Sequence, residues 1–475
     1  MVKQMSIYSP SVSQLLTPHA GSLKDPRGNI AIGDGGEVYR IVTSAGLEDF
    51  KTVEDTGLYA HLIEAGKLIA HEACAPQNDI SNSQTTRLLS HPRIPVISYP
   101  YEWCFEQLKR AALLQLDLHL ESLRFDTTLS DATAFNVQFI GARPIFIDTL
   151  SFIPYREGML WAGQAQFTQE YLNPLLIQAY RDLSLSTVYR GSMSGVPSKW
   201  VRAITPVRHK LSLRYFTYLF LPDVTASRAI KAGPPGQQAV RGKLPKAAFR
   251  YMLEQLRRWI SGLQTKDRVS AWSDYTETRS YEDASLSEKR QCVADWITHA
   301  KPSMVLDFGC NTGEFSLLAL ASGAQYVVGL ESDHKALSVA YDAAHQKTAQ
   351  FLPLYQDLLN PSPSQGWASQ ERQSLSERVA PDFVLALAII HHLAISGNIP
   401  LPRIVSYLTG LSKRGIIEWV PKSDPMIQAL LHNREDIFAT YTEQVLENSL
   451  RQNGVSIQAK KTLQNGRILY FYAPA

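Results

Sequence analysis

Cysteine is scarce in this sequence, and its four copies lie far apart. The chain of 475 residues contains Cys74, Cys104, Cys292 and Cys310, with no Cys-x-x-Cys pair among them. Cysteines spaced in this way argue against a disulfide framework and a cysteine-rich zinc site, and they suit a reducing compartment. We therefore expect a cytoplasmic protein without a metal site.

Long hydrophobic runs and a strong net charge are also missing. No stretch approaches the ~18 uninterrupted apolar residues that a transmembrane helix needs, and Met1 to Pro10 lack the apolar core of a signal peptide. The formal net charge is only +3, which favours no class of partner. We expect no transmembrane segment, and the length of 475 residues predicts two or three domains.

A glycine turn is the most informative feature that the sequence does contain. The apolar run 304–306 predicts a buried strand, which ends in Asp307-x-Gly309-x-Asn311-x-Gly313 immediately before a predicted helix. Glycine takes positive φ values and allows a ligand to approach the main chain closely. The sequence therefore predicts a ligand site at this strand end.

Two acids indicate what the turn binds. A second apolar run, 326–330, ends on Glu331, and an acid ~20 residues after such a turn holds the ribose hydroxyls of a nucleoside ligand in doubly wound sheets. Asp307 would repel the pyrophosphate of a dinucleotide, but it can serve a ligand with an ammonium or sulfonium centre. The stretch resembles motif I of the class I S-adenosylmethionine-dependent methyltransferases, and Glu331 matches the ribose-binding acid of their motif II.

This resemblance implies an α/β, seven-strand Rossmann-like methyltransferase domain over residues 271–475, with S-adenosyl-L-methionine as its cofactor. In the family, an acid at the place of Asp357 accepts a hydrogen bond from the adenine amino group. Besides the strands 304–306 and 326–330, we expect strands over 351–354, 382–390, 415–420, 455–459 and 467–472, and helices over 286–300, 314–321, 333–345 and 435–453. The residues expected to bind the cofactor are Asp307, Gly309, Cys310, Asn311, Gly313, Glu331, Ser332, Asp357 and Leu358.

The acceptor should lie outside the carboxyl ends of the fourth and fifth strands. His391 and His392 follow the fourth strand, and histidine is the side chain best able to take a proton near neutral pH. We predict that one of them is catalytic, the alternative being a structural bond to a backbone carbonyl. Tyr275, Glu418 and Asp424 are predicted to bind substrate. The Asn/Asp-Pro-Pro-Tyr signature of nucleic-acid amino methylation is absent, which disfavours a base as acceptor.

Residues 25–190 show a second pattern. Asp131 precedes Asn136 by five residues, and a predicted hairpin then ends on Asp148. This segment resembles the catalytic segment of the protein-kinase and aminoglycoside-phosphotransferase fold, which implies a base at Asp131 and magnesium ligands at the other two positions. The phosphate-binding lysine of that family has only positional candidates, Lys51 and Arg40. We expect a degenerate, kinase-like α+β domain without phosphotransfer, or an unrelated α+β domain in which Asp131 caps a turn.

The remaining segments have less definite patterns. Residues 1–24 are expected to be a flexible arm, and 191–270 a mostly helical connector rich in Lys, Arg and aromatic residues. Such a stretch can follow a phosphate backbone or lie on an anionic membrane. The alternative is a helical face whose charges are solvated or meet acids elsewhere in the chain. In the N-terminal region we expect strands over 30–32, 37–42 and 94–98, and helices over 56–70 and 105–124.

The whole arrangement is similar to a bacterial group of nodulation-type (NoeA-like) class I methyltransferases. The resemblance rests on the cofactor motifs and on the segments 97–103, 131–136, 146–152, 272–275 and 418–421. It implies methyl transfer to a small-molecule or glycan-like acceptor and leaves the acceptor and the oligomeric state open. The alternatives are a non-catalytic or regulatory binding protein, and a nucleic-acid methyltransferase that uses the basic connector.

Overall fold

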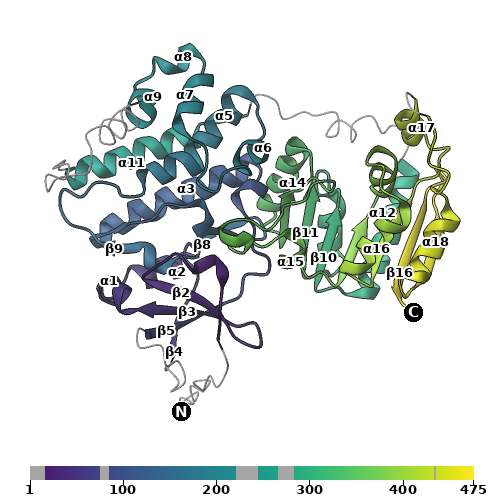
Figure 1. Cartoon of the computed structure of the whole chain (residues 1–475), viewed down its shortest axis with the longest axis horizontal. Helices are drawn as coiled ribbons and strands as arrows, with labels where there is room; N and C mark the ends of the chain where they lie inside the picture. Colours follow the sequence, from purple (N-terminus) through teal and green to yellow (C-terminus); the bar gives the residue numbers. More distant parts are fainter. Residues whose placement is uncertain (1–15, 75–84, 221–243, 266–282, 433–434) are drawn as a thin grey trace.

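The computed structural model describes residues 16–74, 85–220, 244–265, 283–432 and 435–475. Figure 1 shows two halves: an N-terminal half with a five-stranded sheet below a group of helices, and a C-terminal half built on a seven-stranded sheet. Among the described residues, none of the helices combines the length and the apolar composition that crossing a bilayer requires.

The five-stranded sheet has the order β1-β2-β3-β5-β4. The predicted hairpin of residues 30–32 and 37–42 is confirmed as β2 and β3, whose turn is closed by the Gly36 N–H donating to the Gly33 carbonyl at 2.9 Å. Within the expected arm 1–24, residues 1–15 lie outside the described part, whereas β1 already pairs with β2. The strands are β1 (Thr17–Pro18), β2 (Gly28–Ile32), β3 (Val38–Thr43), β4 (Glu72–Cys74) and β5 (Thr85–His91).

One prediction in this region is confirmed in part, one is wrong, and α1 and β5 were not predicted. The helix expected over 56–70 is the shorter α2 (Leu58–Glu64), which begins after the left-handed Gly57 (φ +79°), and α1 (Ser44–Asp55) precedes it. Residues 94–98 form no strand. The N–H of Ser98 donates to the Gln138 side chain at 2.9 Å, and its carbonyl accepts from the same side chain at 3.0 Å. The Gln138 side chain thus takes the place of the backbone hydrogen bonds that a neighbouring strand would provide.

The predicted helix 105–124 is confirmed as α3 (Phe105–Ser122), which runs through the core of the N-terminal half. The helix α11 (Lys246–Ser261), from the segment expected as a connector, packs along α3 and pairs its Arg257 with Asp117. Between them come the strands β6 (Thr127–Leu129), β7 (Val137–Ile140), β8 (Arg143–Phe146) and β9 (Phe152–Pro154). Helices follow at α4 (Gln164–Phe167), α5 (Asn173–Arg181), α6 (Leu185–Tyr189), α7 (Ser198–Ile204), α8 (Val207–Lys210) and α9 (Leu213–Tyr215), with π-helical turns at Thr168–Leu172 and Phe216–Phe220.

The seven-stranded sheet confirms the Rossmann-like domain. Its order is β12-β11-β10-β13-β14-β16-β15, and its strands are parallel apart from β16, which is antiparallel to β14 and β15. The central strands are near-continuous apolar runs, as a sheet buried on both faces requires. The strands are β10 (Met304–Phe308), β11 (Tyr326–Glu331), β12 (Phe351–Tyr355), β13 (Phe383–Ala386), β14 (Gly415–Trp419), β15 (Val455–Thr462) and β16 (Ile468–Pro474).

The helices of this half agree with the prediction in part. The helix expected over 314–321 has those bounds in α13, but the one expected over 435–453 begins only at Glu443, where the Thr442 side chain caps it. The strand expected over 382–390 ends at Ala386, because Ala388 takes a φ of +52°. The helices are α12 (Asp283–Ala300), α13 (Glu314–Ala321), α14 (His334–Gln346), α15 (Leu375–Arg378), α16 (Leu401–Leu411), α17 (Pro425–Leu431) and α18 (Glu443–Gln452).

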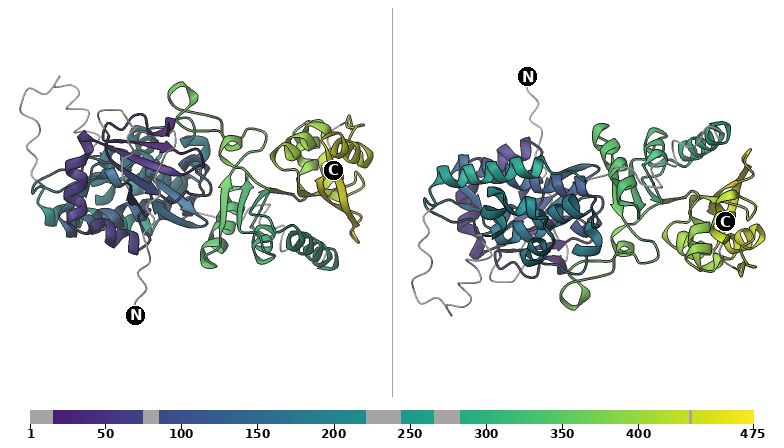
Figure 2. Two further views of the ribbon diagram at one scale, coloured as in Figure 1. Left: turned by 90° about the horizontal axis from the view of Figure 1, so that it is seen from below. Right: turned by 90° about the horizontal axis from the view of Figure 1, so that it is seen from above.

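The two halves meet at the β12 edge of the large sheet. Figure 2 shows the N-terminal half against this end, with β16 and the C-terminus at the opposite end. Glu102 and Arg378 form an ion pair of 2.5 Å across the contact, and their side chains are 0% and 1% exposed. The Gln107 side chain also donates to the Pro353 carbonyl at 3.0 Å. Because a buried charge needs its partner, this pair fixes how the halves fit together.

Candidate active site

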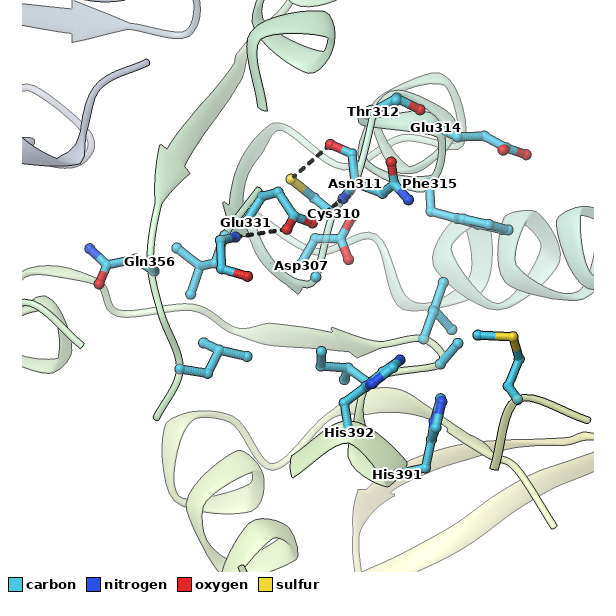
Figure 3. A pocket seen from close by; sticks show the side chains of 18 of the residues that line it. Asp307, Cys310, Asn311, Thr312, Glu314, Phe315, Glu331, Gln356, His391 and His392 are labelled. Carbon is cyan, nitrogen blue, oxygen red and sulfur yellow. Dashed lines mark hydrogen bonds between the residues drawn. The ribbon is translucent and has the colours of Figure 1, made fainter. Parts of the chain in front are cut away.

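The glycine turn joins β10 to α13 and forms one wall of a cavity of about 340 Å³ (Figure 3). The backbone is left-handed at Gly309, Asn311 and Gly313, with φ values of +72°, +50° and +83°. The Gly309 N–H donates to the Leu330 carbonyl at 2.9 Å, which holds the turn against β11. A Cβ at Gly313 would come within 2.6 Å of the Phe351 ring, so this position requires glycine for space as well as for φ.

Most of the residues predicted to bind the cofactor come together around this cavity. Gly313 and Asp357 are not among its lining residues, and the Asp357 carboxylate instead accepts the Leu359 N–H at 2.9 Å. The adjacent Gln356 does line the cavity, and its side chain donates to Glu102 of the N-terminal half at 2.8 Å. The predicted residues that line it are Asp307, Gly309, Cys310, Asn311, Glu331, Ser332 and Leu358.

Asp307 places a carboxylate at the base of the turn. It is 2% exposed, and its Oδ2 accepts a hydrogen bond of 2.6 Å from the Ser316 hydroxyl. Burial raises the pKa of Asp307 to about 6, although the Ser316 hydrogen bond and the charge of Lys289 act in the opposite direction. The Ser316 hydroxyl that donates to Asp307 is uncharged. A cationic ligand would therefore stabilise the ionised form of this carboxylate.

Glu331 ties the end of β11 to the glycine turn. Its Oε2 accepts the Asn311 N–H at 2.9 Å, and its Oε1 accepts the N–H groups of Ser332 and Asp333 at 2.7 and 2.8 Å. Burial raises the pKa of Glu331 against the effect of these three bonds. Since each carboxylate oxygen has two lone pairs, Oε2 retains the capacity to accept a bond from a ligand hydroxyl.

His391 and His392 lie across the cavity from the glycine turn (Figure 3). His391 is 1% exposed, and neither of its ring nitrogens has a hydrogen-bond partner among the described residues. Burial lowers the pKa of His391 to about 3, and His392 and Arg467 act in the same direction. The pair follows the left-handed Ala388 and opens a π-helical turn, His392–Ser396. Irregular backbone of this kind is common at functional sites.

Glu418 and Asp424, predicted to bind substrate, belong to an ion-pair network. Lys289 Nζ lies 2.5 Å from Glu418 Oε2, and Arg467 Nε lies 2.8 Å from Asp424 Oδ2. Asp424 also accepts the Met426 N–H at 2.9 Å and so caps α17. Among the described residues, the two cations line the cavity and the two carboxylates do not. The charges that this network presents to a ligand are therefore positive.

One predicted substrate residue, Tyr275, lies outside the described residues. Sequence reasoning missed eleven lining residues. Six of them belong to the glycine turn, the first position of the helix after it, or predicted strands: Thr312, Glu314, Leu330, Leu387, Ala388 and Ile389. The other five are Lys289, Phe315, Gln356, Met426 and Arg467. Two of these five have a traceable signal, because Gln356 directly follows β12 and Arg467 is the first residue of the strand expected over 467–472. The other three belong to helices, and only packing decides which of their side chains face the cavity.

The N-terminal half brings together the three residues of the kinase-like pattern. The Asn136 amide nitrogen lies 3.4 Å from Asp131 Oδ2 and 3.3 Å from Asp148 Oδ2. Arg40 of β3, rather than Lys51, lies beside this group, with 2.8 Å between its guanidinium and Asp148 Oδ1. Across the described part of the chain, no three or more His, Cys, Asp or Glu side chains are grouped as a metal site requires.

Comparison with known proteins identifies the relatives of this chain. The nodulation protein NoeA of Rhizobium meliloti (strain 1021) is 40% identical over 456 residues, which is 95% of this chain and 95% of the relative. The chain belongs to the NoeA family. Because the similarity spans almost the whole length, both halves described above are part of this family resemblance. No protein-family model matches the sequence.

Two solved structures match part of the chain. Magnesium protoporphyrin IX methyltransferase (ChlM) from Synechocystis PCC 6803, with bound SAH, is 17% identical, and the match covers 55% of this chain and 97% of that one with a TM-score of 0.30. The N-methyltransferase NodS from Bradyrhizobium japonicum WM9 is 13% identical, with 41% and 99% covered and a TM-score of 0.31.

Proposed function

We propose that this NoeA-family chain is an enzyme that transfers a methyl group from S-adenosyl-L-methionine to a small-molecule or glycan-like acceptor. The observation that carries the proposal is one cavity of about 340 Å³ with two different walls. One wall is the glycine turn with Asp307 and Glu331, and the other has the buried His391, whose ring nitrogens have no hydrogen-bond partner in the described part of the chain. A nucleoside ligand with a cationic centre suits the first wall, and a neutral acceptor group suits the second.

The residues present fit the proposed cofactor. The Glu331 carboxylate would accept bonds from the ribose hydroxyls, and Asp307 would face the positive charge that the amino-acid portion carries. Gln356 and Leu358 line the cavity just after β12, where the adenine is expected. When bound, the cofactor supplies an electrophilic methyl group on a sulfonium. Its own amino-acid carboxylate or a group of the acceptor would contact Lys289 or Arg467.

His391 and His392 would act on the acceptor. The low pKa of His391, about 3, keeps the ring neutral at physiological pH, so it can accept a hydrogen bond from a hydroxyl or amine at either nitrogen. A ring with so low a pKa is a weak base, and its first task is to orient the acceptor. Positioning of this kind accounts for a large part of catalysis when a bimolecular step becomes effectively unimolecular.

Calorimetric titration with S-adenosyl-L-methionine tests this proposal. We expect saturable binding by the full chain, and a loss of at least about tenfold in affinity in Glu331→Ala, since the ribose would lose its acceptor. The same change at the exposed Glu64 of the N-terminal half is the matched control and should leave binding intact. Absence of binding by the unmodified chain, or equal binding by Glu331→Ala, would sink the proposal.

Affinity for the cofactor without turnover would instead support a binding or regulatory protein. Radiolabelled cofactor incubated with extracts separated into glycan, lipid, small-molecule and nucleic-acid fractions distinguishes the two. We expect label in a glycan or small-molecule fraction and its loss in His391→Ala. Label confined to nucleic acid would favour the base-methylating alternative.

We also infer that the N-terminal half is a degenerate kinase-like domain that transfers no phosphate. The support is the ion pair between Arg40 and Asp148, whose side chains are 7% and 14% exposed. Phosphoryl transfer needs metal ligands and a cation on the phosphates at the same time. In this half, the Arg40 guanidinium is paired with Asp148, the carboxylate that a magnesium ion would need as a ligand.

The four cysteines are all free thiols, which supports a reducing, cytoplasmic location.

A further inference from the structure

One short segment of the N-terminal half exposes several large hydrophobic side chains. Six of them fall within residues 200–220, and the most exposed are Leu211, Leu213 and Val207 at 83%, 79% and 72%. We call this the α7–α9 face; its apolar members are Trp200, Val207, Leu211, Leu213, Phe216 and Phe220. Single exposed hydrophobic residues need no explanation, but a group of this size indicates an interaction surface.

The segment that carries this face is anchored by other side chains. Tyr215, Tyr218 and Leu219 point inward and are buried, and the Tyr218 hydroxyl donates to the Met252 carbonyl of α11 at 2.7 Å. His209 stacks on Tyr180 of α5 at a centroid distance of 4.0 Å. The apolar groups are thus held outward by a packed inner face. Figure 1 places α7, α8 and α9 at the margin of the N-terminal half, on the side away from β4 and β5.

The charge of this face has one sign. The sequence has no Asp or Glu between Asp182 and Asp223. Arg208 and Arg214 are exposed beside the apolar group. The cations in that interval are Arg190, Lys199, Arg202, Arg208, Lys210 and Arg214. Of these, Arg190 lies away from the apolar group and donates to the Asn360 carbonyl of the C-terminal half at 2.8 Å. In the neighbouring α11, Arg257 is paired with Asp117 and Arg250 with Glu254.

The combination selects one kind of partner. A nucleic acid would use the cations and stack on the aromatic rings, but it gains nothing from exposed aliphatic side chains such as Leu211 and Leu213. A helix-binding groove of an acidic protein would need a long continuous helix, whereas the longest helical stretch of this face, α9 with the π-helical turn after it, spans only residues 213–220. A lipid surface accepts aliphatic and aromatic groups at the acyl boundary while its headgroups attract the cations, and tryptophan favours that boundary. We propose that the α7–α9 face docks the protein on the surface of an anionic lipid bilayer.

Vesicle flotation with the full-length protein tests the proposal. We expect the protein to float with phosphatidylcholine–phosphatidylglycerol vesicles, to float weakly with phosphatidylcholine alone, and to be released by raised salt. The paired change Leu211→Asp and Leu213→Asp removes the apolar contact, and Arg208→Glu with Arg214→Glu removes the attraction. Each pair should reduce the bound fraction at a given lipid concentration by about tenfold or more.

Matched controls lie elsewhere on the surface. Trp367→Asp changes an exposed aromatic residue of the C-terminal half, and Arg124→Glu reverses an exposed cation away from the face. Neither should alter flotation. Because the four changed residues of the face are exposed, thermal unfolding of both paired variants should match the unmodified protein. Cofactor titration should also be unchanged, so this proposal and the methyltransferase proposal fail separately.

Three results would overturn it. Equal binding to neutral and anionic vesicles, or binding that survives the arginine changes, would remove the role of charge. Absence of flotation together with self-association that Leu211→Asp and Leu213→Asp abolish would make this face a contact between copies of the chain. A salt-sensitive gel shift with RNA or DNA, lost in the arginine variant, without flotation would assign the face to nucleic acid.

Discussion

Each half of this molecule gathers two carboxylates at its candidate site, Asp307 and Glu331 in one and Asp131 and Asp148 in the other, yet the partners of those carboxylates differ. In the C-terminal cavity, Asp307 is bonded to the neutral Ser316 hydroxyl, and Glu331 to backbone N–H groups. In the N-terminal group, Asp148 is paired with the Arg40 guanidinium. A carboxylate with neutral partners keeps its charge available to a ligand, whereas one paired with a cation has already been neutralised. The nature of the partner therefore separates a candidate binding site from a structural group.

The largest effect that tests this contrast is on stability. Arg40→Met should lower the free energy of unfolding by about 3 kcal/mol, because it leaves Asp148 in a mostly buried position without its cation. Adding Asp148→Asn should recover a large part of that loss, since the amide needs no counter-ion. Denaturant unfolding of the two variants and the parent gives both values. A loss below about 1 kcal/mol, the range of exposed pairs, would show that Asp148 does not depend on Arg40.

The second effect is on ligand affinity and its dependence on pH. The pKa of Asp307, raised to about 6, means that its charge is present above that pH and is lost as the pH falls through it. We expect affinity for S-adenosyl-L-methionine to fall by about tenfold between pH 8 and pH 5. Asp307→Asn should bind at pH 8 about as weakly as the parent does at pH 5. Its stability should change little, because Ser316 can still donate to the amide oxygen.

Calorimetric titration across pH supplies that measurement, and the asparagine variant is its own control. The pKa of Glu331 is also raised, so part of the pH effect in the parent could come from that residue. If the affinity of Asp307→Asn falls with pH as steeply as that of the parent, the pH effect belongs to Glu331, and Asp307 is not the carboxylate whose charge the ligand uses. A flat profile in the variant would assign it to Asp307.

The C-terminal half was predicted from sequence more accurately than the N-terminal half, and the reason is the range of the interactions involved. The bounds of α13 and, to within two residues, the ends of β10 and β11 follow from local signals, namely apolar runs closed by a glycine turn or an acid. The irregular segment 94–98 is instead held by Gln138, about forty positions further along the chain, and by Arg378 of the other half. No local pattern predicts such contacts.

The same limit applies to the site. Residues at or just after the carboxyl ends of strands, such as Asp307, Glu331 and His391, were predicted because the fold brings those ends together. Lys289 was missed because its contact with Glu418 joins α12 to β14 over 129 positions. That contact pairs Glu418 with a cation, and the cation rather than the acid lines the cavity. Sequence spacing indicates where polar groups lie and leaves open which of them neutralise each other.

The last prediction is that changes to the carboxylates of the N-terminal half have no effect on methyl transfer and that this half turns over no ATP. Asp131 occupies the place of a kinase base, but its Oδ1 accepts the Thr133 N–H at 2.9 Å and its Oδ2 lies 3.4 Å from the Asn136 amide, as in a capped turn. Asp131→Asn should therefore leave methyl transfer unchanged apart from any loss of folded protein. The full chain with ATP and magnesium should release no ADP above the background of Asp148→Ala. Magnesium-dependent phosphorylation of any acceptor, abolished in Asp148→Ala, would contradict this: the Arg40 pair would then have to open during a reaction cycle, and the group would be an active site closed by its own cation.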